Sequence, residues 1–118
     1  MVLFALMALA AGCATDTGNP RLLEVNRSTI TKQGPDDEHR EEFYVAWGGA
    51  NITRVKFEYR QVYRANEIFA KTYVPTKRHS NVFTVRGEEF RNGGKVSAWR
   101  VTLWQGDKLA AEQKSSLW

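Results

Sequence analysis

The sequence predicts an all-β fold, a seven-stranded antiparallel β-sandwich formed by residues 21–118. Short apolar runs alternate with polar residues at a period of two, which is typical of half-buried strands. Turn-forming residues separate these runs, and no stretch carries the apolar stripe of an amphipathic helix. Seven short runs in roughly 100 residues favour a sandwich, with a small open barrel as the alternative.

Length and composition limit the fold to one domain. The chain has 118 residues, a formal net charge of +4, and 42% hydrophobic residues. It is too short for a two-domain enzyme and apolar enough to form a core, and the lack of a heptad repeat excludes a coiled coil. The single cysteine has no partner for an intrachain disulfide.

The first three strands are predicted from faces of alternating residues. In chain order, the residues that share one face of a strand are Leu23, Val25 and Arg27, then Phe43, Val45 and Trp47, then Val55, Phe57 and Tyr59. The opposite face of the third strand is charged throughout and consists of Arg54, Lys56, Glu58 and Arg60. This strand therefore has one face in the core and one in water.

The remaining four strands follow at short intervals. They are Ile68–Val74, Val82–Arg86, a strand over residues 97–104, and Leu109–Trp118. In the sixth strand, one face consists of Ser97, Trp99, Val101 and Leu103, and the other of Ala98, Arg100, Thr102 and Trp104. The face with Trp99, Val101 and Leu103 is expected to point inward. Gln105-Gly106-Asp107 predicts a tight hairpin turn between the last two strands. We expect Trp118 to cap one end of the sandwich.

Part of this pattern resembles fibronectin type III domains. Val45-Ala46-Trp47 and the run 52–60 are similar to that family's strands B and C, and 83–101 looks like its strand E, E–F loop and strand F. The resemblance covers most of residues 41–118 and departs from the family at Asn92, where a Pro is usual, and in lacking the tyrosine that opens strand F. It implies a fibronectin-like or immunoglobulin-like sandwich in which strands C, F and G lie side by side.

The first residues indicate a targeting segment. Residues 1–12 are uncharged and apolar, too few to span a bilayer but typical of the apolar region of a secretory signal. Leu9-Ala10-Ala11-Gly12-Cys13 resembles the lipobox of bacterial lipoproteins. The resemblance implies cleavage before Cys13, a diacylglycerol on its thiol and an acyl chain on the new amino terminus, with residues 13–20 as a lipidated tether. The alternative is an apolar segment with an incidental buried cysteine.

Two further expectations follow from this segment. No Lys or Arg precedes the apolar run, so we expect the true start to lie upstream of Met1 or the sequence to be a fragment. Ala14 follows the cysteine, and by resemblance to the sorting rule of enteric bacteria the lack of Asp there favours the outer membrane.

The sequence contains no motif that indicates an enzyme. The two histidines, His39 and His79, lie in no nucleophile or metal-binding motif, and no phosphate-binding glycine loop is present. We therefore expect no enzyme activity, no cofactor and no metal. The acidic run 36–42 lacks the spacing of a calcium loop, and we interpret it as a solvated loop between the first two strands.

The candidate binding surface is the outer face of the third, sixth and seventh strands. Its predicted residues are Arg54, Lys56, Arg60, Arg100, Trp104 and Lys114. With Glu58 and Glu112 this face has five basic and two acidic residues, a balance of +3. Arg and Trp are enriched at interfaces, but a solvated, salt-bridged face with Arg100 stacked on an aromatic ring is the alternative. The basic stretch Lys71–Ser80 has the same two interpretations.

These features predict a membrane-anchored lipoprotein of the bacterial envelope that binds or adheres without catalysis. An anionic envelope component is the expected partner, either lipopolysaccharide phosphates, phospholipid headgroups or an acidic protein. Nucleic acid is not, because the basic residues form no known recognition motif. The alternative is a structural accessory lipoprotein that docks an envelope-spanning or surface assembly.

Overall fold

The computed structural model describes residues 18–32 and 38–118. The predicted signal segment, Cys13 and the tether up to residue 17 lie outside the described residues. Within the described ranges, no helix is long and apolar enough to cross a membrane.

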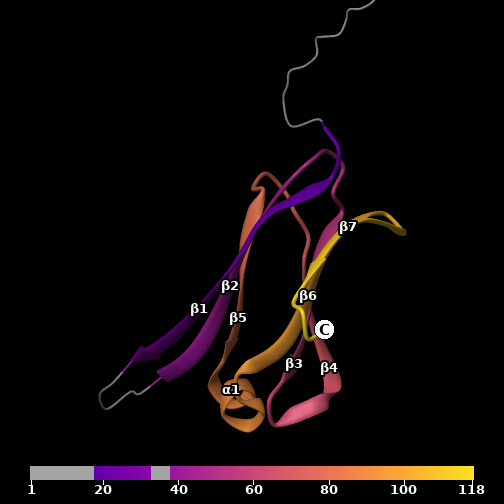
Figure 1. Cartoon of the computed structure of the whole chain (residues 1–118). Helices are drawn as coiled ribbons and strands as arrows, with labels where there is room; N and C mark the ends of the chain where they lie inside the picture. The colour runs from indigo at the N-terminus through magenta and orange to yellow at the C-terminus, as the bar shows by residue number, and fades with distance from the viewer. Residues whose placement is uncertain (1–17, 33–37) are drawn as a thin grey trace, which may run out of the picture.

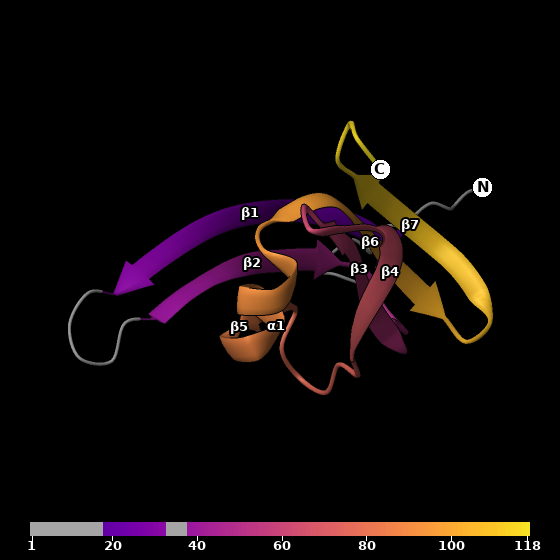
Figure 2. The same cartoon turned by 90° about the horizontal axis from the view of Figure 1, so that it is seen from below.

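The described chain forms seven strands in two antiparallel sheets that pack face to face (Figure 1). Sheet order is β1-β2-β5 in one layer and β4-β3-β6-β7 in the other. The strands are β1 (Arg21–Lys32), β2 (Glu38–Gly48), β3 (Arg54–Gln61), β4 (Arg64–Tyr73), β5 (Ser80–Arg86), β6 (Val96–Gln105) and β7 (Lys108–Lys114). The β1–β2 hairpin extends beyond the other strands when seen from below (Figure 2). This arrangement confirms the predicted sandwich.

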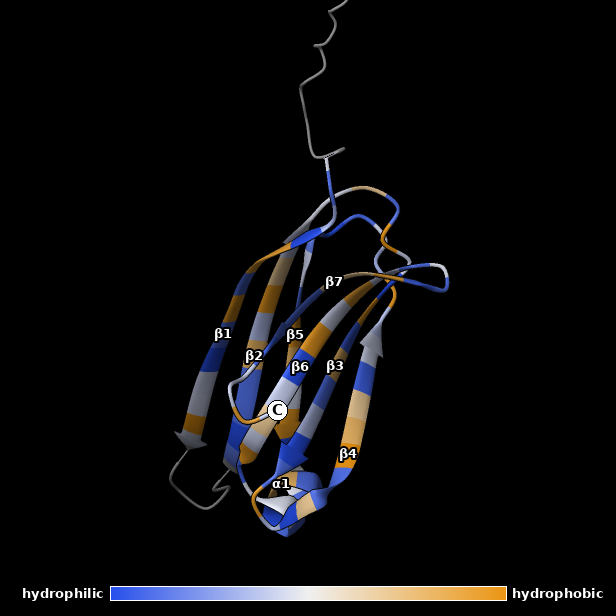
Figure 3. Ribbon diagram, turned by 45° about the vertical axis from the view of Figure 1, so that its right-hand side comes forward, coloured by the Kyte–Doolittle hydropathy of each residue, from blue (hydrophilic) through white to orange (hydrophobic). Residues whose placement is uncertain are grey.

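The core lies between the sheets and comes from the alternating faces. Hydrophobic and hydrophilic residues alternate along the strands (Figure 3). Four aromatic rings form its centre: Phe57 packs 4.7 Å from Phe43, 5.1 Å from Tyr59 and 5.3 Å from Phe83, measured between ring centroids. Trp47 is 2% exposed, in agreement with the predicted inward face of β2.

Two predicted rows of residues, at Leu23 and at Ser97, are wrong by one position. The β1–β2 register shifts between Leu22 and Glu24, so that Leu22 packs against the core and Leu23 is 59% exposed. The β3–β6 register shifts at Arg60/Gln61, which places Val96 in the core in the position predicted for Ser97. A single inserted residue moves the side chains beyond it to the opposite face, and periodicity does not reveal where that insertion occurs.

The acidic run is not a loop throughout. Asp36 and Asp37 lie outside the described residues, but β2 begins at Glu38, and Glu41 faces inward with no exposed surface. It sits in the same row as Phe43 and Val45. The prediction of a solvated loop is therefore wrong for residues 38–42, because strand alternation continues through the charged residues.

A short helix, α1 (Gly87–Gly93), replaces the expected loop between β5 and β6. Gln61 anchors it: its amide nitrogen donates to the carbonyl oxygens of Glu89 at 3.1 Å and Gly94 at 2.9 Å. Gly93 packs so closely that a Cβ there would lie 2.2 Å from the Gln61 side-chain oxygen. In this chain, contacts from β3 therefore hold the connection that leads into β6.

The chain after β7 does not continue as a strand. β7 ends at Lys114, and the backbone N–H of Ser115 donates to the Trp99 carbonyl at 3.0 Å before the chain turns. Trp118 then lies on the outer face of the four-stranded sheet, against Arg60 and Arg100. The prediction that the strand reaches Trp118 and that its ring caps one end is wrong, because these two cations provide a closer surface for it.

Candidate binding face

Strand pairing brings the predicted binding residues onto one surface. Arg54 of β3 lies opposite Trp104 of β6, Glu58 opposite Arg100, and Arg100 opposite Lys114 of β7. Directly opposed residues in an antiparallel pair project to the same side of the sheet. All six predicted residues, Arg54, Lys56, Arg60, Arg100, Trp104 and Lys114, are therefore on the outer side of the four-stranded sheet, which we call the basic face.

Arg54 and Trp104 form a stacked pair at one end of the basic face. The Arg54 guanidinium carbon lies 4.5 Å from the centre of the indole, within the range of a cation–π contact. The indole N–H donates to the Thr102 hydroxyl at 2.9 Å, which fixes the ring. Arg54 makes no ion pair with any residue in the described part of the chain. It is thus a positioned cation without a carboxylate partner there.

Arg100 has the opposite environment. Its guanidinium donates to Glu58 Oε1 at 2.7 and 3.0 Å and to Glu112 Oε2 at 3.2 Å. The hydrogen bond to Glu58 is the main cause of the raised pKa of Arg100. Lys56 adds a looser contact, with its Nζ 3.9 Å from Glu58. Two carboxylates already neutralise Arg100, so it connects β3, β6 and β7 rather than offering a charge to a ligand.

Trp118 also belongs to the basic face, although the sequence did not predict it there. Its indole lies 5.3 Å from the Arg60 guanidinium and 5.5 Å from that of Arg100. Ala98, on the same side of the sheet, is 3% exposed. No motif predicts this contact, because it depends on the turn after Ser115.

The neutralised centre divides the basic face. The acidic residues Glu58 and Glu112 both contact Arg100, whereas Arg54 and Lys114 have no ion pair within the described residues. The +3 balance predicted for the face is therefore carried mainly by its periphery. The salt-bridged interpretation is confirmed at the centre of the face, whereas binding through the cations at its edges stays a prediction.

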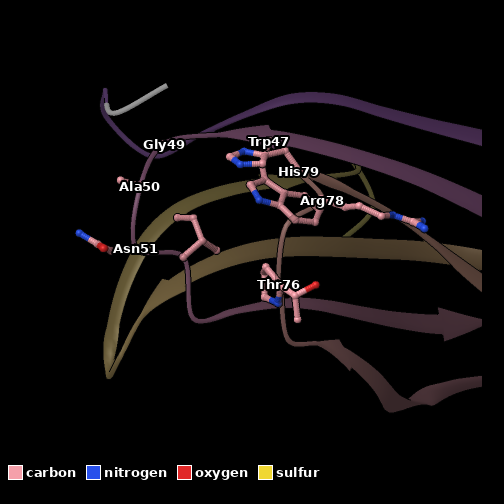
Figure 4. Close-up of a pocket in the computed structure, with 9 residues that line it drawn as sticks. Trp47, Gly49, Ala50, Asn51, Thr76, Arg78 and His79 are labelled. Atoms are coloured by element: carbon pink, nitrogen blue, oxygen red, sulfur yellow. The ribbon is translucent and has the colours of Figure 1, made fainter. Parts of the chain in front are cut away.

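A separate cavity of about 440 Å³ lies at the end of the sandwich near Pro20 (Figure 4). The β2–β3 turn and the β4–β5 loop form it, and Trp47, Thr76, Arg78 and His79 are among its lining residues. Lys71, from the same basic stretch, instead pairs with Glu89 of α1 at 3.2 Å. The stretch Lys71–Ser80 therefore does not form one continuous basic patch.

The two histidines have different surroundings. His39 stacks on Phe90 at 6.4 Å between ring centroids, while His79 lines the cavity near Trp47. Across residues 18–32 and 38–118, no group of three His, Cys, Asp or Glu residues could hold a metal ion. One contact stands out: the hydroxyl of the buried Tyr59 donates to the partly exposed Glu89, and burial raises the pKa of Tyr59 well above its usual value.

Comparison of the whole chain with protein-family models, with curated proteins and with solved structures finds no match.

Proposed function

We propose that this protein is a lipoprotein of the bacterial envelope whose fibronectin-like domain binds phosphate-bearing envelope lipids through the basic face. The sandwich order supports the resemblance, since β3, β6 and β7 lie side by side as strands C, F and G do in that family. The lipobox at Cys13 supports the anchor. Lipopolysaccharide and anionic phospholipids share the phosphate chemistry that arginine and lysine bind well.

The observation that carries this proposal is the state of Arg54. Its guanidinium is stacked on Trp104, and no described carboxylate neutralises it. Lys56 is on the same strand and the same side, with only a 3.9 Å contact to Glu58. A cation that is already ordered loses little side-chain entropy when it binds an anion. Arg54 and Lys56 are therefore the first residues to test.

The test is binding of lipopolysaccharide to the immobilised full chain. Arg54→Glu/Lys56→Glu should weaken binding about ten-fold or more, because two attractive contacts become repulsive. The matched control, Lys77→Glu/Arg78→Glu, makes the same change in net charge at the cavity end and should have little effect. Equal weakening by both pairs, or no difference between intact and dephosphorylated lipopolysaccharide, would contradict the proposal.

The anchor has its own test. Cells that express the gene from a start extended upstream are labelled with an alkyne palmitate, and the wild type is compared with Cys13→Ser. Label that appears in the outer membrane and is lost in Cys13→Ser supports the lipoprotein. Absence of label in the wild type contradicts the anchor and leaves the binding test on the basic face unaffected.

A second candidate, the structural accessory, is favoured by the free edge at β4. This strand ends the four-stranded sheet, and Ile68 on it is 52% exposed. An unpaired edge can accept a strand from another protein. A photocrosslinker at Thr72 should then capture a specific envelope protein, and Ile68→Lys should abolish the capture. A crosslinker that captures nothing in intact cells would count against this role.

A further inference from the structure

A second cavity, of about 480 Å³, lies at the α1 end of the sandwich. Its walls come from three places in the chain: the inner side of the β1–β2 hairpin, the β3–β4 turn, and α1 with the residues that follow it. We call it the mouth. Its volume is in the range of sites that hold small ligands.

The mouth has an apolar wall formed by Val62, Tyr63 and Phe90. Tyr63 is 76% exposed and Val62 is 49% exposed, although both occupy a two-residue turn where Gly, Asn or Asp is usual. Large apolar side chains exposed together on a small domain indicate a contact surface.

Backbone contacts hold this wall in place without a ligand. The amide of Val62 donates to the Lys95 carbonyl and that of Tyr63 to the Gly93 carbonyl, each at 2.9 Å. Gly94 has φ +79°, and a Cβ there would lie 2.8 Å from the Tyr63 ring and from Val62 Cγ2. The two side chains therefore pack directly over a glycine that has no room for a larger residue. A wall fixed in this way does not have to be ordered by the ligand.

The rim of the mouth is cationic. Arg91, in the last turn of α1, and Lys95, just after it, both line the cavity and are exposed. Neither forms an ion pair within the described part of the chain, and no carboxylate is among the lining residues. Two acidic residues of the packed elements have partners of their own: Glu89 contacts Lys71 and Tyr59, and Glu41 contacts Arg27.

We propose that the mouth binds a small amphiphilic carboxylate, such as a medium-chain aliphatic acid. Its hydrocarbon part packs against Val62, Tyr63 and Phe90, and its carboxylate lies between Arg91 and Lys95. Thr29, Thr31 and His39 form the polar wall opposite, where the Thr29 hydroxyl already donates to Glu41 and the Thr31 hydroxyl contacts the His39 ring. This site is at the opposite end of the sandwich from Pro20 and is separate from the basic face, so it does not depend on the proposed function.

The probe is sodium octanoate, added to the ¹⁵N-labelled full chain and followed by two-dimensional NMR. We expect saturable shifts of the Tyr63, Gly94 and Lys95 amides. Because the readout is resolved by residue, octanoate that binds to the apolar N-terminal residues does not affect the result. Shifts confined to other regions, or no shift at Tyr63 and Gly94, would overturn the proposal.

Charge variants test the carboxylate contact. Arg91→Glu/Lys95→Glu should weaken octanoate binding about ten-fold, whereas Lys77→Glu/Arg78→Glu, with the same net charge, should leave it within two-fold. Octanol, which lacks the carboxylate, should bind both pairs equally. Tyr63→Ser, an exposed change that spares folding, should weaken octanoate and octanol alike. Equal octanoate affinities in the two charge-reversed pairs would show that no cation at the rim contacts the ligand.

Discussion

Arg27 of β1 and Glu41 of β2 form an ion pair, with Nε and Oε2 2.6 Å apart, although the Glu41 side chain has no exposed surface. The carboxylate also accepts the Val96 amide at 2.6 Å and the Thr29 hydroxyl at 3.2 Å. Arg27 donates in turn to the Val96 carbonyl at 2.6 Å. Since Val96 begins β6, this network joins the three-stranded sheet to the four-stranded sheet.

We expect Arg27→Met to lower the free energy of unfolding by about 2–4 kcal/mol, because a buried Glu41 would lose its counter-charge. The partial exposure of Arg27 keeps the cost below that of a fully buried pair. The measurement is urea denaturation followed by circular dichroism. Arg91→Met, which changes an exposed arginine with no described ion pair, is the control and should stay within about 0.5 kcal/mol of wild type.

The double variant Arg27→Met/Glu41→Leu distinguishes a charge effect from lost packing. Replacing both members of the pair with apolar residues should restore most of the lost stability, because no uncompensated charge remains. A double variant as unstable as Arg27→Met would show instead that the hydrogen bonds to Val96 are the main contribution.

We predict that the free energy of unfolding falls in alkali because of Tyr59. Burial, and then the hydrogen bond and charge of Glu89, raise the pKa of Tyr59 far above its usual 10.0. The unfolded chain therefore releases this proton near pH 10 while the folded chain keeps it, so stability is intact below pH 10 and falls above it by up to about 1.4 kcal/mol per pH unit. Tyr59→Phe should remove this part of the slope when urea midpoints are measured from pH 9 to 11.

The exposed Tyr63 provides the control for that experiment. Tyr63→Phe removes a hydroxyl from a side chain that is 76% exposed, and it should leave the alkaline slope unchanged. If Tyr59→Phe retains the wild-type slope, the Tyr59–Glu89 contact does not determine the response to alkali.

Alternation predicts which side of a strand faces the core, because inward rows such as Val55, Phe57 and Tyr59 repeat at the strand period. The same parity turns Arg54 and Arg100 outward, but the prediction that their strands are neighbours comes from the resemblance to fibronectin type III domains. Parity fails at Leu23 and Ser97, where one extra residue reverses the row. A register shift of this kind depends on how the strand pairs with its neighbour, and the alternation of residues within one strand does not report that pairing.

Contacts between distant parts of the chain are the ones that the sequence leaves open. Glu41 reads as a surface charge until Arg27 and Val96 are brought to it from other strands. The mouth is similar, since Val62 and Tyr63 have no helical or strand period and acquire a role only beside Gly94. Each of these contacts joins residues more than ten positions apart in the chain, so periodicity does not report them.

We predict that position 93, at the end of α1, tolerates no side chain larger than that of glycine. Gly93→Ala would place a Cβ 2.2–2.5 Å from the Gln61 amide, which is buried and bonded to Glu89 and Gly94. We expect a loss of about 1–3 kcal/mol, typical of overpacking, measured by urea denaturation. The neighbouring exposed change, Asn92→Ala, should have almost no effect. A tolerated alanine at Gly93 would mean that Gln61 moves without losing its hydrogen bonds.

We predict that the residues after β7 stabilise the fold through the contacts of Trp118. Trp118→Ala removes two cation–π contacts, with Arg60 and Arg100. We expect the free energy of unfolding to fall by about 1–2 kcal/mol. Leu117→Ala, at a side chain that is 76% exposed, should change it by less than about 0.5 kcal/mol. Similar losses in both variants would mean that the indole of Trp118 makes no special contribution. Arg100 would then be held mainly by its ion pairs with Glu58 and Glu112.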